Sequence, residues 1–449
     1  MLSGTDRPVC AIGRRFSVTA PLLQAQPGAH AAAHRRRLPG TVAFYLLASI
    51  IVAFLAGSSA PTPLYAVYAA RWGFSPITTT VVFGVYALAV LTALLIVGRL
   101  SDHIGRRPVL LAALAVQAAT MIVFITADGV PQLLVARIIQ GLSTGAAAGA
   151  IGAGMLDLNK TRGTIANAVA PITGTAAGAL GSGLLVQYLP QPTHLVYLVL
   201  LGVFVLQAIG VLLMPETSSP TPGALASLRP QFAIPAPVRR PLMFAVPALV
   251  AMWAVAGLYG ALGPALVKLV SGSGSIVLGG LSLFVLAGTG AATVLLLQRQ
   301  NARQLMLIGG GALLAGVALT LVAVDVRSTA SFFVGTAIAG IGFGGAFQGA
   351  IRSVVPLAAA HQRAGVLSVV YVVSYLALGL PAVIAGVLLV HEGNLVETSV
   401  QFGVAVMALA ALALAGALRP ARPAADPRPE RDEYIEPGQA REMCSAERA

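Results

Sequence analysis

The stretch Gly98-Arg99-Leu100-Ser101-Asp102-His103-Ile104-Gly105-Arg106-Arg107 decides the fold of this chain. It separates two apolar runs, residues 77–97 and 109–127, each about long enough to cross a bilayer as a helix. Because few residues join the two runs, the loop must turn sharply. Gly98 and Gly105 suit such a turn, since glycine accepts positive φ and close backbone approach. Asp102 is the only acid of the loop and lies among three arginines, so we expect a tight, charged loop between two membrane helices.

The composition indicates a membrane protein. The chain has 449 residues, of which 57% are hydrophobic and only 10% are charged, and its mean hydropathy is +0.86. A soluble domain carries roughly 25% charged residues, so water is not the main solvent of this chain. The net charge of +13 comes from arginines in short loops and tails. No basic domain lies outside the apolar runs, which argues against a nucleic-acid partner.

Twelve apolar segments predict twelve transmembrane helices. We place them at about 41–70, 76–98, 108–127, 131–155, 164–189, 193–214, 241–269, 275–298, 303–325, 329–355, 364–390 and 396–418. Residues 215–240 are rich in Pro and Ser and interrupt the pattern after the sixth segment. The sequence therefore predicts an all-α integral membrane protein with two pseudo-symmetric six-helix bundles, 41–214 and 241–418, joined by this cytoplasmic linker. The flanking segments 1–40 and 419–449 are expected to be disordered cytoplasmic tails.

The positive charges predict the topology. With the N-terminus inside, 24 of the 28 Lys and Arg residues fall in cytoplasmic parts. The outer loops hold only Arg71 and Arg327, which is the asymmetry expected of a membrane protein with both ends in the cytoplasm. The two cysteines, Cys10 and Cys444, lie in opposite tails, so we expect neither a disulfide framework nor a cysteine metal site. The expected location is a bacterial cytoplasmic membrane.

The two halves repeat weakly. Arg162-Gly163 precedes the fifth helix as Arg363-Ala364-Gly365 precedes the eleventh. In the fourth helix Gly141 and Gly145 correspond to Gly340 and Gly344 in the tenth. Small residues at such spacing let helix backbones approach closely.

The loop at 98–107 resembles the G-x-L-[AS]-D-x-x-G-R-[RK] loop between helices 2 and 3 of the major facilitator superfamily. The resemblance extends by layout over residues 41–418. It implies alternating access, with a substrate site between the two halves near the membrane midplane. It also implies that the loop is a conformational switch, in which the loop acid meets the start of helix 11 near Ala364 and the arginine meets an acid that ends helix 4. The switch residues are then Gly98, Asp102, Gly105, Arg106 and Asp157.

The run Arg137-Ile-Ile-Gln140-Gly141 puts an arginine inside the fourth helix. Such a residue is costly in a bilayer and normally faces a cavity or a partner. The alternative is that Arg137 extends outward to water, because it lies about six residues, or some 9 Å, from the outer end. The Arg-x-x-Gln-Gly spacing resembles the helix-4 motif of the family, whose arginine takes part in substrate or proton coupling. We therefore favour a cavity position.

Other polar and aromatic residues lie deep in the predicted helices. The first helix is interrupted by Pro61 and Pro63, and neighbouring hydroxyls can satisfy the carbonyls that the prolines free. Each such residue alone is more often a packing residue than a binding residue. The resemblance implies that several of these residues lie on helices that line the cavity in this family. We therefore take the following set as transport-cavity residues: Tyr65, Arg137, Gln140, Trp253, Tyr259, Gln348 and Tyr371.

No carboxylate falls in the middle of a predicted helix. Asp102 and Asp157 lie at cytoplasmic ends, and Asp128 and Asp325 lie at outer ends. A buried acid is the usual proton carrier of secondary pumps. Coupling therefore runs through Arg137 or the acids near the gates, or the protein does not use protons.

These features predict a monomeric secondary active transporter that moves a small amphipathic organic solute, with export by an antiport-like mechanism as the leading hypothesis. The run Pro171 to Gly183 partly resembles the glycine-rich helix-5 motif of antiporters, although the Gly-Pro pair is out of register. The alternative is an uptake permease for a sugar or metabolite, but the helices are poor in Asn, Gln and Glu. A receptor or scaffold would need a folded domain outside the membrane, and the outer loops have fewer than about ten residues. No Walker motif, cofactor fingerprint or catalytic cluster indicates an enzyme.

Overall fold

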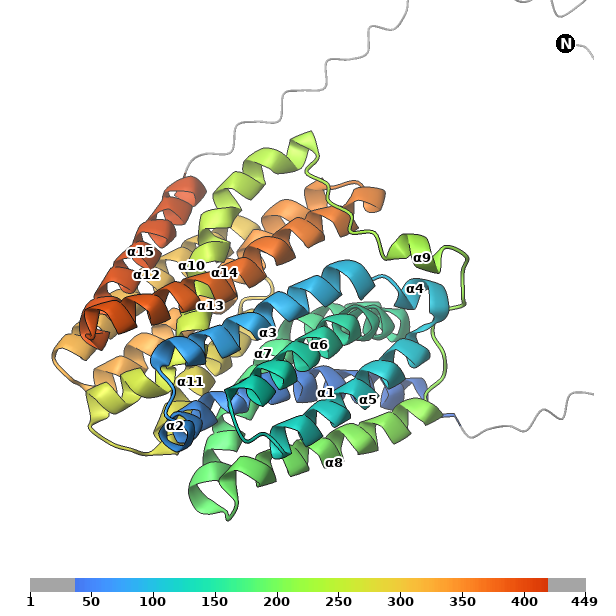
Figure 1. The fold of residues 1–449 in the computed structure, drawn as a ribbon. Coiled ribbons are helices and arrows are strands. Elements are labelled where there is room, and N and C mark those ends of the chain that lie inside the picture. Colours follow the sequence, from blue (N-terminus) through green and yellow to red (C-terminus); the bar gives the residue numbers. More distant parts are fainter. Residues whose placement is uncertain (1–36, 419–449) are drawn as a thin grey trace, which may run out of the picture. The chain divides into compact units, whose positions relative to one another are not determined.

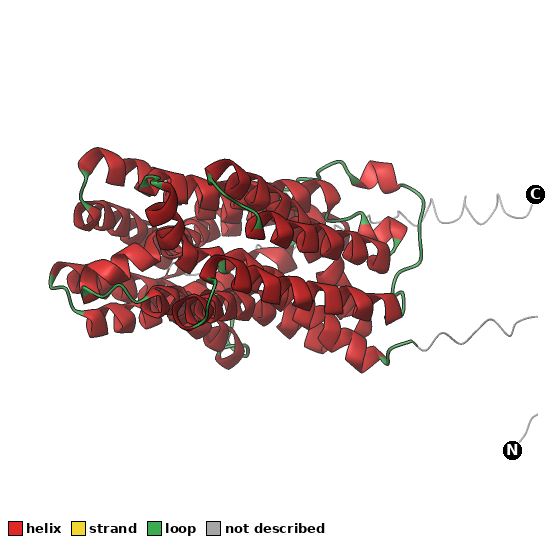
Figure 2. Cartoon of the chain, turned by 60° about the horizontal axis from the view of Figure 1, so that its bottom comes forward, coloured by secondary structure: helices red, strands yellow, loops and turns green. Residues whose placement is uncertain are grey.

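The computed structural model describes residues 37–418, which are built from helices without any strand (Figures 1 and 2). Twelve helical segments are long and apolar enough to cross a membrane, so the expected all-α membrane fold is confirmed. The helices are α1 (Gly40–Ser59), α2 (Pro61–Trp72), α3 (Pro76–Val97), α4 (Ser101–Ile104), α5 (Arg106–Ile125), α6 (Val130–Leu158), α7 (Lys160–Tyr188), α8 (Pro192–Leu213), α9 (Ala224–Ser227), α10 (Ala236–Ser271), α11 (Ile276–Leu296), α12 (Ala302–Asp325), α13 (Thr329–Val354), α14 (Arg363–Glu392) and α15 (Leu395–Leu418). Short 3₁₀ turns, Val355–Leu357 and Ala360–Gln362, join α13 to α14. Apart from residues 37–40, the predicted tails lie outside the described residues.

The first membrane segment consists of two helices, α1 and α2, that meet at Ala60 just before Pro61. The proline ring removes a backbone donor, so carbonyls of the preceding turn lose their helical partners. The Gly57 carbonyl oxygen, which Pro61 leaves without a helical donor, accepts from the Gln140 side-chain amide over 3.0 Å, so an amide rather than a neighbouring hydroxyl satisfies it. The Ser182 hydroxyl of α7 donates to the Ala60 carbonyl oxygen at the junction itself over 2.6 Å. At the end of α1, the Ser59 hydroxyl also donates to the Thr175 carbonyl oxygen of α7, over 2.8 Å. The break therefore anchors α1 against α7.

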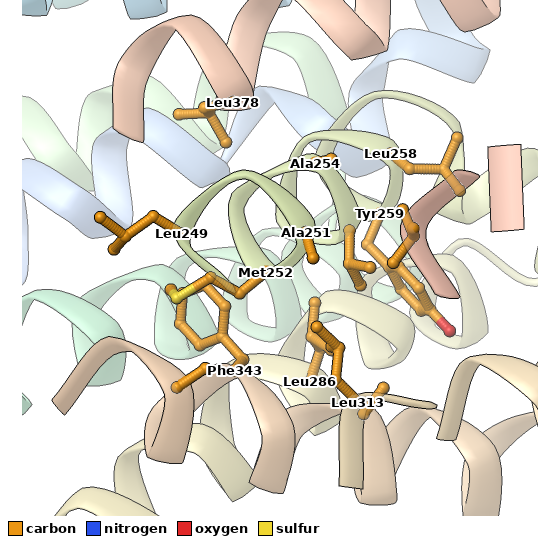
Figure 3. Close-up of a cluster of buried hydrophobic side chains, with 14 of the residues drawn as sticks. Leu249, Ala251, Met252, Ala254, Leu258, Tyr259, Leu286, Leu313, Phe343 and Leu378 are labelled. Carbon is orange, nitrogen blue, oxygen red and sulfur yellow. The ribbon is translucent and has the colours of Figure 1, made fainter. Parts of the chain in front are cut away.

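Two hydrophobic cores correspond to the two bundles. One gathers buried side chains between Ala43 and Met214 from α1 to α8. The other gathers side chains of α10 to α15, and Figure 3 shows Leu249 and Met252 of α10 near Phe343 of α13 in this core. The second core also takes in three side chains from α3 and α7, which are Phe83, Ala87 and Ala179. The helices α3 and α7 thus face the second bundle.

The internal repeat appears as matched helix contacts. A methyl group on Gly141 of α6 would overlap the Tyr86 carbonyl oxygen of α3, and one on Gly340 of α13 would overlap the Leu286 carbonyl oxygen of α11. One turn later, Gly145 and Gly344 approach α3 and α11 in the same way. Glycine is needed at these positions because the helix backbones touch. The predicted correspondence of these glycines is confirmed.

The bundles meet along α3 with α14 and α7 with α11 (Figure 1). The Thr62 hydroxyl donates to the Gly260 carbonyl oxygen over 3.0 Å. The Gln187 side-chain oxygen accepts from the Ser275 hydroxyl at 2.8 Å and from the Val277 amide at 3.0 Å. We call the end of the spans that carries the loop between α3 and α5 the loop end. All three bonds lie in the half of the spans farther from the loop end.

The described helices differ from the predicted bounds by a few residues at several ends, and two differences bear on the linker and the loop. The seventh membrane helix, α10, begins at Ala236 rather than 241, so the last five residues assigned to the linker are helical. Pro237 is compatible with this start, because proline is tolerated in the first turn of a helix. The loop predicted at 98–107 contains one helical turn, α4.

Candidate functional site

The loop between α3 and α5 turns at Gly105, which has φ +98° and ψ 157°. This is a conformation that favours glycine, so the expectation for Gly105 is confirmed. The expectation of positive φ is wrong for Gly98, whose φ of −55° is helical. Its backbone lies at a close helix crossing, because a methyl group on Gly149 of α6 would overlap the Gly98 carbonyl oxygen.

Arg106 is the centre of this loop. It is only 7% exposed although it begins α5. Its Nη1 atom donates to Asp102 and, over 2.7 Å, to the Ser101 hydroxyl. Its Nε atom donates to Asp157 Oδ2 at the end of α6 over 3.3 Å. The structure therefore brings together Asp102, Arg106 and Asp157 at the loop end.

The start of α14 does not join this group. Among residues 37–418, Asp102 pairs with Arg106 of its own loop, and its carbonyl oxygen accepts from the Thr221 hydroxyl over 3.3 Å. No hydrogen bond links it to the region of Ala364. The backbone of residues 232–233 occupies that place instead, since a methyl group on Gly365 would meet the Ala233 amide nitrogen at 2.7 Å.

Glu216 belongs to the loop network, although the sequence analysis assigned it to the linker. Its two carboxylate oxygens accept from the Arg106 amide at 2.8 Å and the Arg107 amide at 3.0 Å. A carboxylate at the first amides of a helix satisfies free donors and favours the helix dipole. Arg107 in turn donates to the last carbonyls of α8, those of Val211 and Leu212. The ends of α5 and α8 are thus held together by reciprocal contacts.

Arg137 lies inside the first bundle with no exposed surface, so the alternative of an outward-reaching side chain is wrong. Its Nη1 atom donates to the Ser58 carbonyl oxygen over 2.9 Å and to the Gln140 side-chain oxygen over 2.7 Å. Gln140 also donates to the Gly57 carbonyl oxygen over 3.0 Å. The guanidinium carbon lies 4.3 Å from the ring centroid of Tyr86, a cation–π contact. The carbonyls before the break between α1 and α2 therefore hold this arginine.

The charge of Arg137 is only partly compensated. Neither ion pair in the described part of the chain involves it, and its Nε and Nη2 atoms have no hydrogen-bond partner there. The buried Tyr65 hydroxyl is also unpartnered in this part of the chain. Both amide atoms of Gln117 are buried without partners as well, and the sequence analysis missed this residue. Unpaired buried polar groups are expensive, so this cluster has donors available for a ligand.

An aromatic cluster lies in the second bundle around Trp253 of α10. Its ring centroid is 5.4 Å from that of Phe343, 5.9 Å from Phe347 and 6.4 Å from Tyr375. The indole nitrogen of Trp253 is buried and has no hydrogen-bond partner in the described structure. Tyr375 belongs to α14, which packs against α3, the helix of Tyr86. The predicted cavity residue Tyr371 is half-buried on the same helix α14. The aromatic cluster and the Arg137 cluster thus lie on helices that meet at the bundle interface.

Two predicted cavity residues lie elsewhere. The Tyr259 hydroxyl is 2.8 Å from the Thr336 hydroxyl in the core of the second bundle, where Figure 3 labels Tyr259. Six residues turn a helix by about 240° relative to Trp253, which explains why the two side chains face different ways. Gln348 donates to the Val294 carbonyl oxygen over 3.1 Å and ties α13 to α11. We therefore leave both residues out of the candidate site.

Three comparisons relate this chain to known proteins, and the first identifies its family. The sequence profile of the Major Facilitator Superfamily matches residues 45–380. An uncharacterized transporter of Rickettsia bellii (strain RML369-C) is 39% identical over 74 residues, which span 16% of this chain and 18% of that protein. A crystal structure of a mutant of the nucleoside transporter NupG matches with a TM-score of 0.64 and 12% identity, over 84% of this chain and 100% of that one. That likeness shows the fold alone. The profile match covers most of the chain, and this chain therefore belongs to the Major Facilitator Superfamily.

Proposed function

We propose that this major facilitator exports a small amphipathic organic solute that carries a hydrogen-bond acceptor, such as a carboxylate, next to an aromatic or branched apolar group. The observation that carries the proposal is the pairing of two unlike clusters across the bundle interface. Arg137 and Tyr65 offer unpartnered donors on one side. Trp253 and its neighbours offer aromatic rings on the other.

The Arg137 cluster supplies the polar half of the site. Hydrogen bonds from a charged donor to a carboxylate are about twice as strong as neutral ones, and a guanidinium can make two in parallel. Nη1 is already used by Ser58 and Gln140, which fixes the group, so Nε and Nη2 remain for the solute. The Tyr86 ring beneath the guanidinium limits its movement. A preoriented cation of this kind favours an acceptor over a purely apolar molecule.

The aromatic cluster supplies the apolar half. Phe343 and Phe347 meet the Trp253 ring edge to face, and Tyr375 stacks on it. Such an arrangement gives a rigid apolar wall with one free indole donor. Ligand sites typically combine apolar walls with a few oriented polar groups. The two bundles would contribute one kind of group each, so the solute is recognised fully only when both are in contact with it.

The loop network supports a role in alternating access. The interbundle hydrogen bonds of Thr62 and Gln187 lie far from the loop end. The network of Asp102, Arg106 and Asp157 stays within the first bundle. We propose that this arrangement is one of two states, and that closing the loop end brings Asp102 to the positive N-terminus of α14.

Energy coupling follows from the position of the acids. Among the described carboxylates, Asp102, Asp157 and Glu216 lie at the loop end. The far end holds Asp128, Asp325, Glu392 and Glu397. Since none is placed in mid-span, we propose that any proton coupling depends on these terminal acids.

Flux in proteoliposomes tests the proposal. Purified protein would be offered aromatic carboxylates, the corresponding neutral amides, and sugars, with and without an imposed pH gradient. We expect the carboxylates to be transported best, and export to be found in vesicles of known orientation. Transport of sugars with indifference to the carboxylates would favour an uptake permease and contradict the proposal.

A further inference from the structure

We propose that the linker between the bundles carries a binding surface for anionic phospholipid headgroups. This inference does not depend on the transported solute. The surface, which we call the linker patch, consists of Leu225, Arg229, Phe232, Ile234, Arg239 and Arg240.

The apolar side chains of the linker patch are unusually open for their size. Leu225 is 84% exposed, Phe232 58% and Ile234 45%. Leu225 lies in the single turn α9, and the other two lie in the extended segment that leads into α10. These residues contrast with the rest of the linker, where exposed positions are mostly small or polar. Exposed apolar side chains of this size indicate a contact with an apolar partner.

All charged residues of the linker patch are positive. Arg229, Arg239 and Arg240 are all exposed. Neither ion pair in the described part of the chain involves them. The sequence has no acid between Glu216 and Asp325, and Glu216 itself accepts from the first amides of α5. Arg239 Nε donates to the Ile234 carbonyl oxygen over 3.2 Å, which leaves its charge without a counter-ion. The three positive charges are therefore available to an external anion.

The linker is fixed so that these side chains point outward. Near its start, the Thr221 amide donates to the His103 carbonyl oxygen over 2.9 Å, and the His103 ring contacts the Pro222 carbonyl oxygen at 3.0 Å. Near its end, the backbone of residues 232–233 packs on Gly365 at the start of α14. The segment is thus held at both ends while its large side chains remain uncovered.

The position of the patch selects the partner. It runs from α9 into the beginning of the membrane helix α10, which holds Arg239 and Arg240, and thus lies at the end of a membrane span. Bulky apolar side chains among arginines are typical of segments that lie in the headgroup region of an anionic membrane. The adjacent helix α10 is long and apolar enough to span a bilayer, so the patch would continue its contact with the membrane. A protein partner would have to cover both the apolar side chains and the arginines of the patch with one folded surface. No element among the described residues indicates such a partner.

Spin labels at single cysteines test this inference. In a chain with Cys10 and Cys444 replaced by serine, labels would be placed at Leu225→Cys and Phe232→Cys. A label at Ser219→Cys, an exposed linker position outside the patch, is the matched control. The full-length protein would be reconstituted in phosphatidylcholine vesicles with and without phosphatidylglycerol, and the accessibility of each label to oxygen and to a water-soluble nickel complex would be measured.

We expect the labels at 225 and 232 to be several-fold less accessible to the nickel complex than the label at 219 when phosphatidylglycerol is present. Changing Arg229, Arg239 and Arg240 together to Gln should abolish this difference, whereas changing them to Lys should keep it. Lysine retains the charge, so the pair of variants separates charge from any effect on folding. Equal accessibility at all three sites would overturn the inference. The inference would also be overturned if the labels at 225 and 232 were equally protected from the nickel complex without phosphatidylglycerol or in the Gln variant. Protection of that kind would come from apolar contact alone.

Discussion

Arg106 Nε donates to Asp157 Oδ2 over 3.3 Å, and this bond joins the start of α5 to the end of α6. The same guanidinium binds Asp102, so one buried arginine holds two acids from different parts of the loop end. Asp157 also accepts from the Thr217 hydroxyl over 3.2 Å. Arg106 and Asp157 are therefore members of one network rather than independent surface charges.

Removing either member should break the same contact. We predict that the effects of Arg106→Ala and Asp157→Asn on the free energy of unfolding are not additive, with an interaction energy of about 0.5–3 kcal/mol. Thermal unfolding in detergent of the two single variants and the double variant would measure it. Full additivity would mean that the pair does not interact in solution.

Glu216 caps α5 from outside the helix. We predict that Glu216→Ala lowers the free energy of unfolding by about 0.5–2 kcal/mol, because the first amides of α5 lose their acceptor. Asp128→Asn is a suitable control, since Asp128 is an exposed acid in the loop between α5 and α6. The melting temperatures of the two variants would be compared. An equal, small change in both would show that the Glu216 contact adds no stability.

Gly145 of α6 lies at a close crossing with α3. A methyl group there would lie 2.8 Å from Ala93 Cβ and would overlap the Val90 carbonyl oxygen. We predict that Gly145→Ala destabilises the protein by about 1–3 kcal/mol, because helices α3 and α6 must separate. Gly181→Ala should be neutral or stabilising, since no atom lies within 4 Å of that added group. The yield of folded protein and its melting temperature would test both, and a stable Gly145→Ala variant would contradict the packing account.

The terminal acids should control any response to a pH gradient. Asp102, Asp128, Asp157 and Asp325 would each be changed to Asn in a separate variant. We predict that in at least one of the four variants transport no longer depends on an imposed pH gradient. The comparison would use initial rates in proteoliposomes at equal protein density. Strong gradient-driven transport in all four variants would exclude these acids as the proton carriers.

Several features were predictable from sequence because their causes are local. The length and hydropathy of each apolar run identify the twelve spans, and the turn at Gly105 follows from its place in a tight loop. The contact of Arg106 with Asp157 was expected only through the family resemblance, since 51 residues separate the two.

Other features depend on how distant helices meet. Glu216 looks like a linker residue until α8 places it beside the start of α5, 110 residues away. Gly149 needs its small size because the Gly98 carbonyl of another helix lies against it, which no local turn pattern reveals. Tyr259 lies deep in a helix, as predicted, but hydropathy does not tell which neighbour its face of α10 meets. Depth in a span is therefore readable from sequence, while orientation within the bundle is not.

The central claim is that the buried, partly unpaired Arg137 binds the acceptor group of the solute, and initial transport rates of Arg137 variants in proteoliposomes test it most directly. Arg71→Ala, at an exposed arginine at the far end of the same bundle, is the control. We predict that Arg137→Ala abolishes carboxylate transport while the protein still folds, and that Arg137→Lys restores only a fraction, because lysine lacks the planar fork for paired hydrogen bonds. Arg71→Ala should transport at the wild-type rate. Wild-type kinetics in a folded Arg137→Ala variant would contradict the account.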